Sequence, residues 1–207
     1  MTFEAPPISK RESGEDRRLA IARAARAIIA EKGLEGLRTR DIAAHVGINV
    51  ATLHYHVPSK EALIALVAET LRDDFKAQSA RHPRTGKSAL QCLYLEFDDF
   101  RETVEDMPDL IIVLTEMVER ARRDPAIAEI ITPLYDFWRL QFAEIFRRGV
   151  EEGSFRNDID PAAAALITTG ALADYWRQWT SFRVSLDQVL GELERAFIIN
   201  PVSSQGR

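Results

Sequence analysis

His54, Tyr55 and His56 follow one another in a chain of 207 residues that has only four histidines. Polar side chains of short reach, on a helix, can hydrogen-bond to base edges and phosphates in the major groove of DNA. A core favours leucine at such positions, whereas a solvent-exposed face favours glutamate or lysine. The triplet therefore predicts a surface that binds a partner outside the chain, and partly buried packing on a helix is the alternative.

Histidines also serve as metal ligands, and the spacing argues against that use here. Residues i and i+2 of a helix point about 200° apart, so His54 and His56 cannot chelate one ion together. The other histidines, His45 and His82, and the single cysteine, Cys92, give no spacing typical of a zinc site. We therefore expect neither a metal nor another cofactor.

The segments around the triplet have the pattern of three helices. Residues 16–32 carry an apolar stripe at spacings of three and four. Thr39 is the expected N-cap of a short helix that Gly47 ends, and Asn49 is the expected N-cap of the next, "VATLHYH". Two short helices joined by a tight turn with glycine are typical of a helix-turn-helix unit. Packing of their apolar residues on the first helix leaves little room inside for four side chains: Thr52, His54, Tyr55 and His56.

Cations near helix starts add an independent indication of an anionic partner. Lys60 falls in the first turn of a helix, where it opposes the helix dipole, yet lysine beside free backbone N–H groups makes a good phosphate site. Arg38, Thr39 and Arg40 form a similar cluster at the start of the second helix. We therefore expect phosphate contacts at both places.

The rest of the chain continues in amphipathic helices without an alternating strand pattern, so the predicted fold class is all-α. Breaks at Gly, Pro and polar clusters separate the further helices, which are expected at about 60–80, 87–105, 108–122, 125–152, 161–180 and 186–199. We predict four segments: a flexible arm, 1–15; a DNA-binding domain, 16–63; a helical ligand-binding and dimerisation domain, 64–200; and a tail, 201–207.

Charge and composition limit the class of protein. The net charge is −5, but residues 1–63 carry ten Lys and Arg against eight Asp and Glu, and the remainder carries seventeen against twenty-four. An N-terminal part with a net positive charge, followed by a part with a net negative charge, is compatible with a nucleic-acid partner. One cysteine, no signal-like run in the first fifteen residues and no membrane-length apolar run predict a cytoplasmic protein without a membrane partner.

From Gly47 to Leu63 the chain contains the runs "GI", "TLHYHV" and "PSKEAL" in close succession. With these runs, residues 17–66 resemble the tetracycline-repressor (TetR) family of bacterial regulators, whose members typically show a Gly-Val/Ile turn, then Thr-Leu-Tyr-aromatic-His-Phe and Pro-Ser-Lys-Glu-Ala-Leu. The resemblance implies base-edge contacts from the region of Asn49, Val50, Ala51 and Thr52, and from His54 or Tyr55. It implies phosphate contacts from four residues: Thr39, Thr52, His56 and Lys60. His54 stands where the family usually has Tyr or Phe, so the resemblance does not carry the hydroxyl contact over to this position.

In this family the rest of the chain forms the dimer and senses a signal. The two last helices are therefore expected to form a four-helix bundle with their copies about a two-fold axis. The expected contacts are Leu166, Ile167 and Gly170 on the first helix and Val189, Leu190, Leu193 and Phe197 on the second. The alternative is that these helices only cover the core of their own chain.

An aromatic-rich set between these regions could line a ligand pocket or form the core. Its members are Phe97, Phe100, Tyr135, Trp138, Phe142, Tyr175, Trp176 and Trp179. Glu116 and Met117 lie beside an apolar run, where Glu116 either contacts a ligand or faces solvent. A large apolar pocket with few polar groups suits an aromatic or amphipathic ligand.

These features predict a homodimeric repressor of the TetR type that binds a palindromic, double-stranded DNA operator and is released by a small-molecule effector. A regulator that answers to a protein partner is one alternative. An all-α enzyme with His54 or His56 as general base is another, and it lacks a nearby orienting group, because the next acid, Glu61, belongs to another helix. We therefore do not expect an enzyme.

Overall fold

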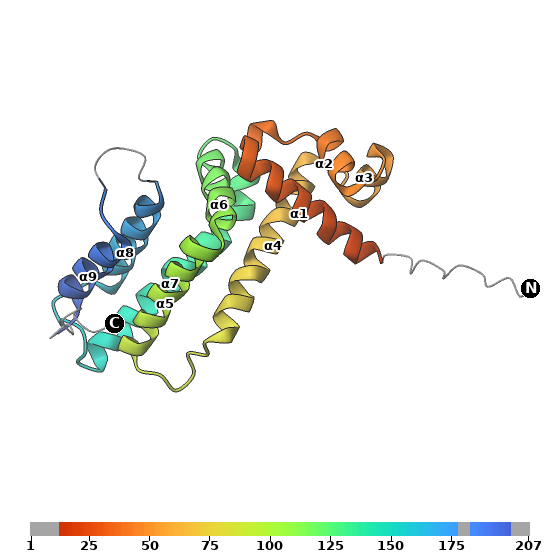
Figure 1. Ribbon diagram of the computed structural model, residues 1–207. Coiled ribbons are helices and arrows are strands. Elements are labelled where there is room, and N and C mark those ends of the chain that lie inside the picture. The colour runs from red at the N-terminus through yellow and green to blue at the C-terminus, as the bar shows by residue number, and fades with distance from the viewer. Residues whose placement is uncertain (1–12, 178–182, 200–207) are drawn as a thin grey trace, which may run out of the picture. The chain divides into compact units, whose positions relative to one another are not determined.

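The computed structural model of the protein describes residues 13–177 and 183–199 (Figure 1). Within these ranges the regular structure is helical, apart from an isolated bridge between Phe155 and Ile198. The helices are α1 Gly14–Lys32, the 3-10 turn η1 Leu34–Gly36, α2 Thr39–Val46, α3 Val50–His56, α4 Lys60–Arg81, α5 Ala89–Asp106, α6 Pro108–Ala121, α7 Pro125–Glu151, α8 Pro161–Trp176 and α9 Leu186–Phe197. The predicted all-α class is confirmed. None of the helices described here has the length and apolar character that crossing a membrane requires.

The chain divides into two compact units, Met1–Thr70 and Leu71–Arg207. The division falls inside α4, seven residues after the predicted domain boundary at residue 63. The first part of this helix therefore belongs to the first unit and its last part to the second.

In the first unit, helix starts and ends follow local capping chemistry. Ser13 Oγ accepts a hydrogen bond from the backbone N–H of Asp16, and Asp16 Oδ2 accepts one from the backbone N–H of Ser13, both at 3.1 Å. This reciprocal cap starts α1 two residues before the predicted start. Gly33, with φ 68°, ends the helix, and its N–H donates to the carbonyl of Ile29.

The core of the first unit is formed where α1 packs on α2 and α3. The apolar residues that the spacing predicts to meet there are buried: Ile21, Ile28, Ile42, Leu53 and Leu63. Val46 and Ile48 flank the turn and are half-buried. Burial of Leu53 fixes the rotation of α3 about its axis, so the next residues on that helix point outward.

The turn between α2 and α3 depends on Gly47, which adopts φ 75° and ψ 32°. This left-handed conformation costs a residue with Cβ about 1 kcal/mol and costs glycine almost nothing. Two residues later, Asn49 Oδ1 accepts a 2.7 Å hydrogen bond from the N–H of Thr52 and starts α3 as the sequence predicts. Gly47 and Asn49 therefore set where α2 ends and α3 begins.

In the second unit, α7 packs on α5, α6 and α8, and α8 also packs on α9. A reciprocal Ser–Gln cap starts α5 at Ser88 and α9 at Ser185. Phe155 packs on Gly149 of α7 so closely that a Cβ at Gly149 would lie 2.1 Å from its ring. Since Phe155 is completely buried and its ring lies 5.5 Å from that of Phe146, glycine is required at position 149.

Candidate nucleic-acid interface and ligand cavity

Helix α3 presents an outward face made of the residues that the sequence singled out. Tyr55 is 84% exposed, which is unusual for a tyrosine, and His54 is exposed beside it. Asn49, Val50 and Ala51 at the start of the helix are also exposed. These side chains give the face hydrogen-bonding tips and an apolar, flat surface, which together suit base edges in a groove.

His56 is half-buried at the end of α3 and takes part in two contacts. Its ring lies edge-on to that of Tyr55, with centroids 5.2 Å apart. Its backbone carbonyl accepts a 2.9 Å hydrogen bond from Nη1 of Arg18 on α1. The sequence alone does not single out Arg18, because nothing in its spacing distinguishes it from the other arginines of that helix.

The start of α2 differs from that of α3. Arg38, not Thr39, occupies the N-cap position, and no side chain there accepts a hydrogen bond from the first turn. Thr39 is instead the first residue of the helix, which corrects the predicted cap by one residue. Arg38 and Arg40 are exposed, so their guanidinium groups can reach an anion beside these backbone N–H groups.

Lys60 is the first residue of α4 and is exposed. Ser59 Oγ accepts a 3.1 Å hydrogen bond from the N–H of Ala62, which caps the helix. The described residues contain no group of three or more His, Cys, Asp or Glu that could hold a metal ion. The exposed side chains Arg38, Arg40 and Lys60 lie at helix starts, where they can contact anions.

The second unit contains a cavity of about 160 Å³. Its aromatic lining is Phe75, Phe100, Tyr135, Phe137, Trp138 and Trp176. Its polar lining includes Gln78, Ser79, Arg84, Glu96, Asp99 and Thr103. The cavity thus combines apolar walls with a group of charged and polar side chains, as expected of a site for a small molecule.

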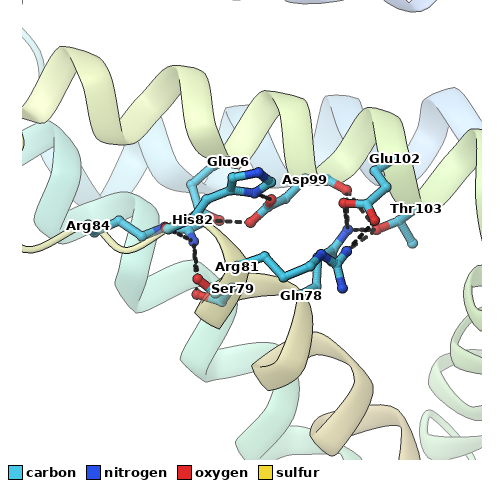
Figure 2. A network of polar contacts seen from close by, with 9 residues as sticks. All are labelled: Gln78, Ser79, Arg81, His82, Arg84, Glu96, Asp99, Glu102 and Thr103. Carbon is cyan, nitrogen blue, oxygen red and sulfur yellow. Dashed lines mark hydrogen bonds and ion pairs between the residues drawn. The ribbon is translucent and has the colours of Figure 1, made fainter.

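Figure 2 shows a polar network that joins the end of α4 and the segment after it to α5, and several of its residues line the cavity. Gln78 is almost completely buried, and its Nε2 donates to the carbonyl of Asp99 at 2.8 Å and to Oγ1 of Thr103 at 3.1 Å. Arg81 pairs with Glu102 at the exposed side of the network. Buried polar groups that are fully hydrogen-bonded fix the packing of the helices that carry them.

Arg84, in the segment between α4 and α5, lies between two carboxylates. Its Nη2 is 3.0 Å from Oε1 of Glu96 and also pairs with Oδ2 of Asp99. The three side chains are only 19%, 13% and 11% exposed, respectively. Burial and the neighbouring Asp99 raise the pKa of Glu96, although Arg84 acts in the opposite direction.

The predicted ligand residues fall into three groups. Four of them line the cavity: Phe100, Tyr135, Trp138 and Trp176. Five lie elsewhere, because Phe97, Met117 and Phe142 are buried in the core, Tyr175 packs against the core and Glu116 is exposed. Trp179 lies outside the described residues. Thr115, next to Glu116, faces the cavity instead.

The predicted dimer residues also separate. Leu166 and Ile167 on α8 are 56% and 57% exposed, and Gly170 is exposed on the same helix. Val189 is half-buried. By contrast, the chain's own core buries Leu190, Leu193 and Phe197, and the ring of Phe197 lies 4.9 Å from that of Phe146. For these three residues the structure therefore favours the alternative of intramolecular packing.

Two family models match the chain. The model of bacterial regulatory proteins of the TetR family matches residues 21–67, which contain α2 and α3. The model of the C-terminal part of BetI-type transcriptional repressors matches residues 98–190. Together they cover most of both units.

Two named bacterial proteins are similar in sequence to most of the chain. The nucleoid occlusion factor SlmA of Haemophilus influenzae is 30% identical over 197 residues, which are 90% of this chain and 86% of that protein. The transcriptional repressor KstR2 of Rhodococcus jostii is 25% identical over 158 residues, 75% of this chain and 76% of that protein.

Solved structures share the fold. A transcriptional regulator from Saccharomonospora viridis, in complex with choline, has a TM-score of 0.79 and 24% identity over 90% of this chain and all of that chain. AibR, in complex with isovaleryl coenzyme A and operator DNA, has a TM-score of 0.72 and 20% identity, with the same shares covered. The chain therefore belongs to the TetR family of bacterial regulatory proteins and is a DNA-binding transcriptional regulator.

Proposed function

We propose that the protein is a homodimeric repressor that binds a palindromic operator and is released by a small apolar or amphipathic ligand. The observation that carries this proposal is the 84% exposure of Tyr55 on a helix whose opposite side is anchored in the core by Leu53. Contact of an exposed aromatic ring with a DNA groove is favourable, because it removes apolar surface of the ring from water. Because its partner is the chromosome, we expect it to act in the cytoplasm.

The DNA contacts follow from the places of the side chains. Base edges are assigned to five exposed residues, Asn49, Val50, Ala51, His54 and Tyr55, and to the half-buried Thr52. Phosphates are assigned to the flanking residues Arg38, Thr39, Arg40, His56 and Lys60. The uncapped start of α2 supports the second assignment, since its first N–H groups can bind a phosphate oxygen.

The dimer face is assigned to α8, with Leu166, Ile167 and Gly170 at its centre. Two large apolar side chains more than half exposed beside a glycine form a surface that a second copy can bury. Val189 of α9 is retained in this proposal. Leu190, Leu193 and Phe197 are not, because their own chain already buries them.

Coupling between ligand and DNA is assigned to α4. This helix begins with the proposed phosphate ligand Lys60, and its last turns carry Phe75, Gln78 and Ser79, which line the cavity. A ligand that binds more tightly to one position of those last turns increases the fraction of molecules in which α4 has that position. Since the two half-sites of an operator lie about 34–36 Å apart, a small change in the distance between the two DNA-binding units of a dimer weakens binding.

Two relatives support a small-molecule signal, because the structures described above contain choline and isovaleryl coenzyme A. A protein partner remains the second candidate signal, as SlmA is named for nucleoid occlusion and not for a ligand. The cavity of about 160 Å³ favours the small molecule. An enzymatic role has no comparable support.

Quantitative gel shifts test the proposal. A DNA fragment from beside the protein's own gene is compared with a shuffled fragment of equal length and composition at one salt concentration. We expect binding to the natural fragment to be at least about 1,000-fold tighter, which is the usual lower limit for specific recognition. If both fragments bind equally well, the protein is used to select sequences from a random DNA pool. Equal affinity for the two fragments together with no preferred sequence from the pool would contradict sequence-specific binding.

A further inference from the structure

Negatively charged side chains outnumber arginines at the polar side of the cavity. Glu96 and Asp99 both pair with the guanidinium of Arg84, so two carboxylates share one arginine in a place largely closed to water, and Asp99 also contacts Nδ1 of the exposed His82 at 3.3 Å. The other lining arginine, Arg177, is paired with the exposed Glu119 through a 2.6 Å contact. The cavity side that is most shielded from solvent therefore carries an excess of negative charge.

The guanidinium of Arg84 is already engaged by oxygen atoms of its own chain. Its Nε donates to Glu96, and its Nη2 pairs with Glu96 and Asp99. Its Nη1 donates to the carbonyl and hydroxyl oxygens of Ser79, at 2.9 and 3.0 Å, and to the carbonyl of His82 at 2.8 Å. Each of the three guanidinium nitrogens thus already has at least one oxygen partner. A ligand carboxylate or phosphate would meet two carboxylates and would have to compete with these bonds.

Aromatic rings stand next to the excess negative charge. Glu96 and Phe100 are four residues apart on α5, so both lie on the helix face that lines the cavity. Tyr135 and Trp138 of α7 add two rings in an edge-on pair with centroids 5.9 Å apart. The faces of aromatic rings attract cations, and the ring of Tyr135 already has the guanidinium of Arg139 at 4.8 Å from its centroid.

We propose that the cavity binds an amphipathic organic cation, with its ammonium group against Glu96 and Phe100 and its apolar body among the rings of α7. The proposal rests on the proposed function, in which this cavity is the effector site. The size fits, since the cavity measures about 160 Å³ and an engineered cavity of about 150 Å³ accepts benzene. A body of one aromatic ring with a compact charged head is therefore the expected ligand size.

Three probes of equal body and different charge test the charge preference of the wild-type protein. They are benzyltrimethylammonium, its neutral carbon analogue 2,2-dimethylpropylbenzene and the anion 3-phenylpropanoate, titrated while tryptophan fluorescence is recorded, because Trp138 lines the cavity. We expect the cation to bind at least about tenfold more tightly than either of the others, the effect of one charge-assisted contact. Equal or tighter binding of the neutral or anionic probe, or no binding of the cation, would overturn the proposal.

Glu96→Gln locates the charge that matters. Gln keeps the size of the side chain and an oxygen that can accept from Nε of Arg84, but it removes the negative charge. The variant should lose about tenfold in affinity for benzyltrimethylammonium and keep its affinity for the neutral probe. Glu102→Gln is the matched control, because it removes the same charge from the same helix at a residue that pairs with Arg81 and does not line the cavity. Equal losses in both variants, or none in Glu96→Gln, would contradict the assignment.

DNA binding is measured in parallel so that the two proposals fail separately. If benzyltrimethylammonium binds with the expected preference but DNA stays bound, the cation assignment stands and the proposed coupling fails. If the protein binds its operator but the cation does not bind in preference to the other probes, the DNA-binding function stands and the cation assignment fails.

Discussion

Arg18 Nη1 donates a 2.9 Å hydrogen bond to the backbone carbonyl oxygen of His56, the last residue of α3. A cation at the end of a helix satisfies a free carbonyl and favours the negative end of the dipole. Because Arg18 lies on α1, the bond ties the proposed reading helix to the first helix of the unit. Arg18 is thus a positioning residue for the face that carries Tyr55.

Arg18→Ala should lower the free energy of unfolding by about 0.3–1 kcal/mol and weaken operator binding more than binding to random DNA. The reason is that α3 loses an anchor, which affects the base contacts first. Arg23→Ala removes the same charge from an exposed position on α1 and serves as the control. If both variants weaken specific and random binding alike, Arg18 acts only through its charge.

Lys60→Ala should weaken binding to every DNA sequence by a similar factor. The dependence of log affinity on log salt should become shallower by about 0.9 per lost phosphate contact, and each subunit loses one. The control Lys76→Ala changes an exposed lysine farther along α4. A salt dependence that Lys60→Ala leaves unchanged would remove Lys60 from the phosphate contacts.

Ile167→Glu should convert a dimer into a folded monomer, because the glutamates of two copies would meet in an apolar interface. Leu193→Glu should instead destabilise the chain itself, since Leu193 is only 6% exposed within one copy. Sedimentation equilibrium and circular dichroism separate the two outcomes. A dimer of normal mass in Ile167→Glu would place the interface away from this face of α8.

Glu96→Gln should gain stability relative to the wild type as the pH rises. Burial raises the pKa of Glu96, so between the ordinary glutamate value and this raised value the unfolded chain has lost a proton that the folded chain keeps. Stability of the wild type therefore falls as pH rises through that interval, whereas Gln has no proton to lose. Arg84 and Asp99 are the charged groups that face Glu96, and His82 contacts Asp99 at 3.3 Å.

Urea unfolding of both proteins at about pH 4 and about pH 7 measures this difference. Glu102→Gln, measured at the same two values, separates the effect of burial from that of removing a charge from α5. A constant difference between Glu96→Gln and the wild type at the two pH values would show that the pKa of Glu96 is not raised.

Periodicity and caps predicted the helices and the side of α3 that is exposed. Asn49 starts α3 as predicted, and Gly47 ends α2 with the left-handed conformation that glycine favours. The predicted cap Thr39 was one residue late, because threonine is accepted both at the cap and inside the first turn. Arg18 could not be predicted, since its partner is a backbone carbonyl of a helix far along the chain.

The cavity was harder to predict because charged residues are normally expected on the solvent side. Glu96 nevertheless follows the buried Cys92 by four residues and Asp99 follows Glu96 by three, so all three share the inward stripe of α5. That periodicity is the signal that could have found them. Helix periodicity also explains why the prediction that Glu116 lines the pocket was wrong. Neighbouring side chains on a helix point about 100° apart, and here Thr115 lines the cavity instead.

The most direct test of the account is the specificity ratio of Tyr55→Ala, which is the affinity for the operator divided by the affinity for random DNA at one salt concentration. If the exposed face of α3 reads base edges, the loss of one such contact removes about 1–3 kcal/mol from operator binding and leaves random binding nearly unchanged, so the ratio falls by about 5- to 150-fold. A ratio equal to that of the wild type in a folded variant would contradict the assignment of this face to sequence recognition.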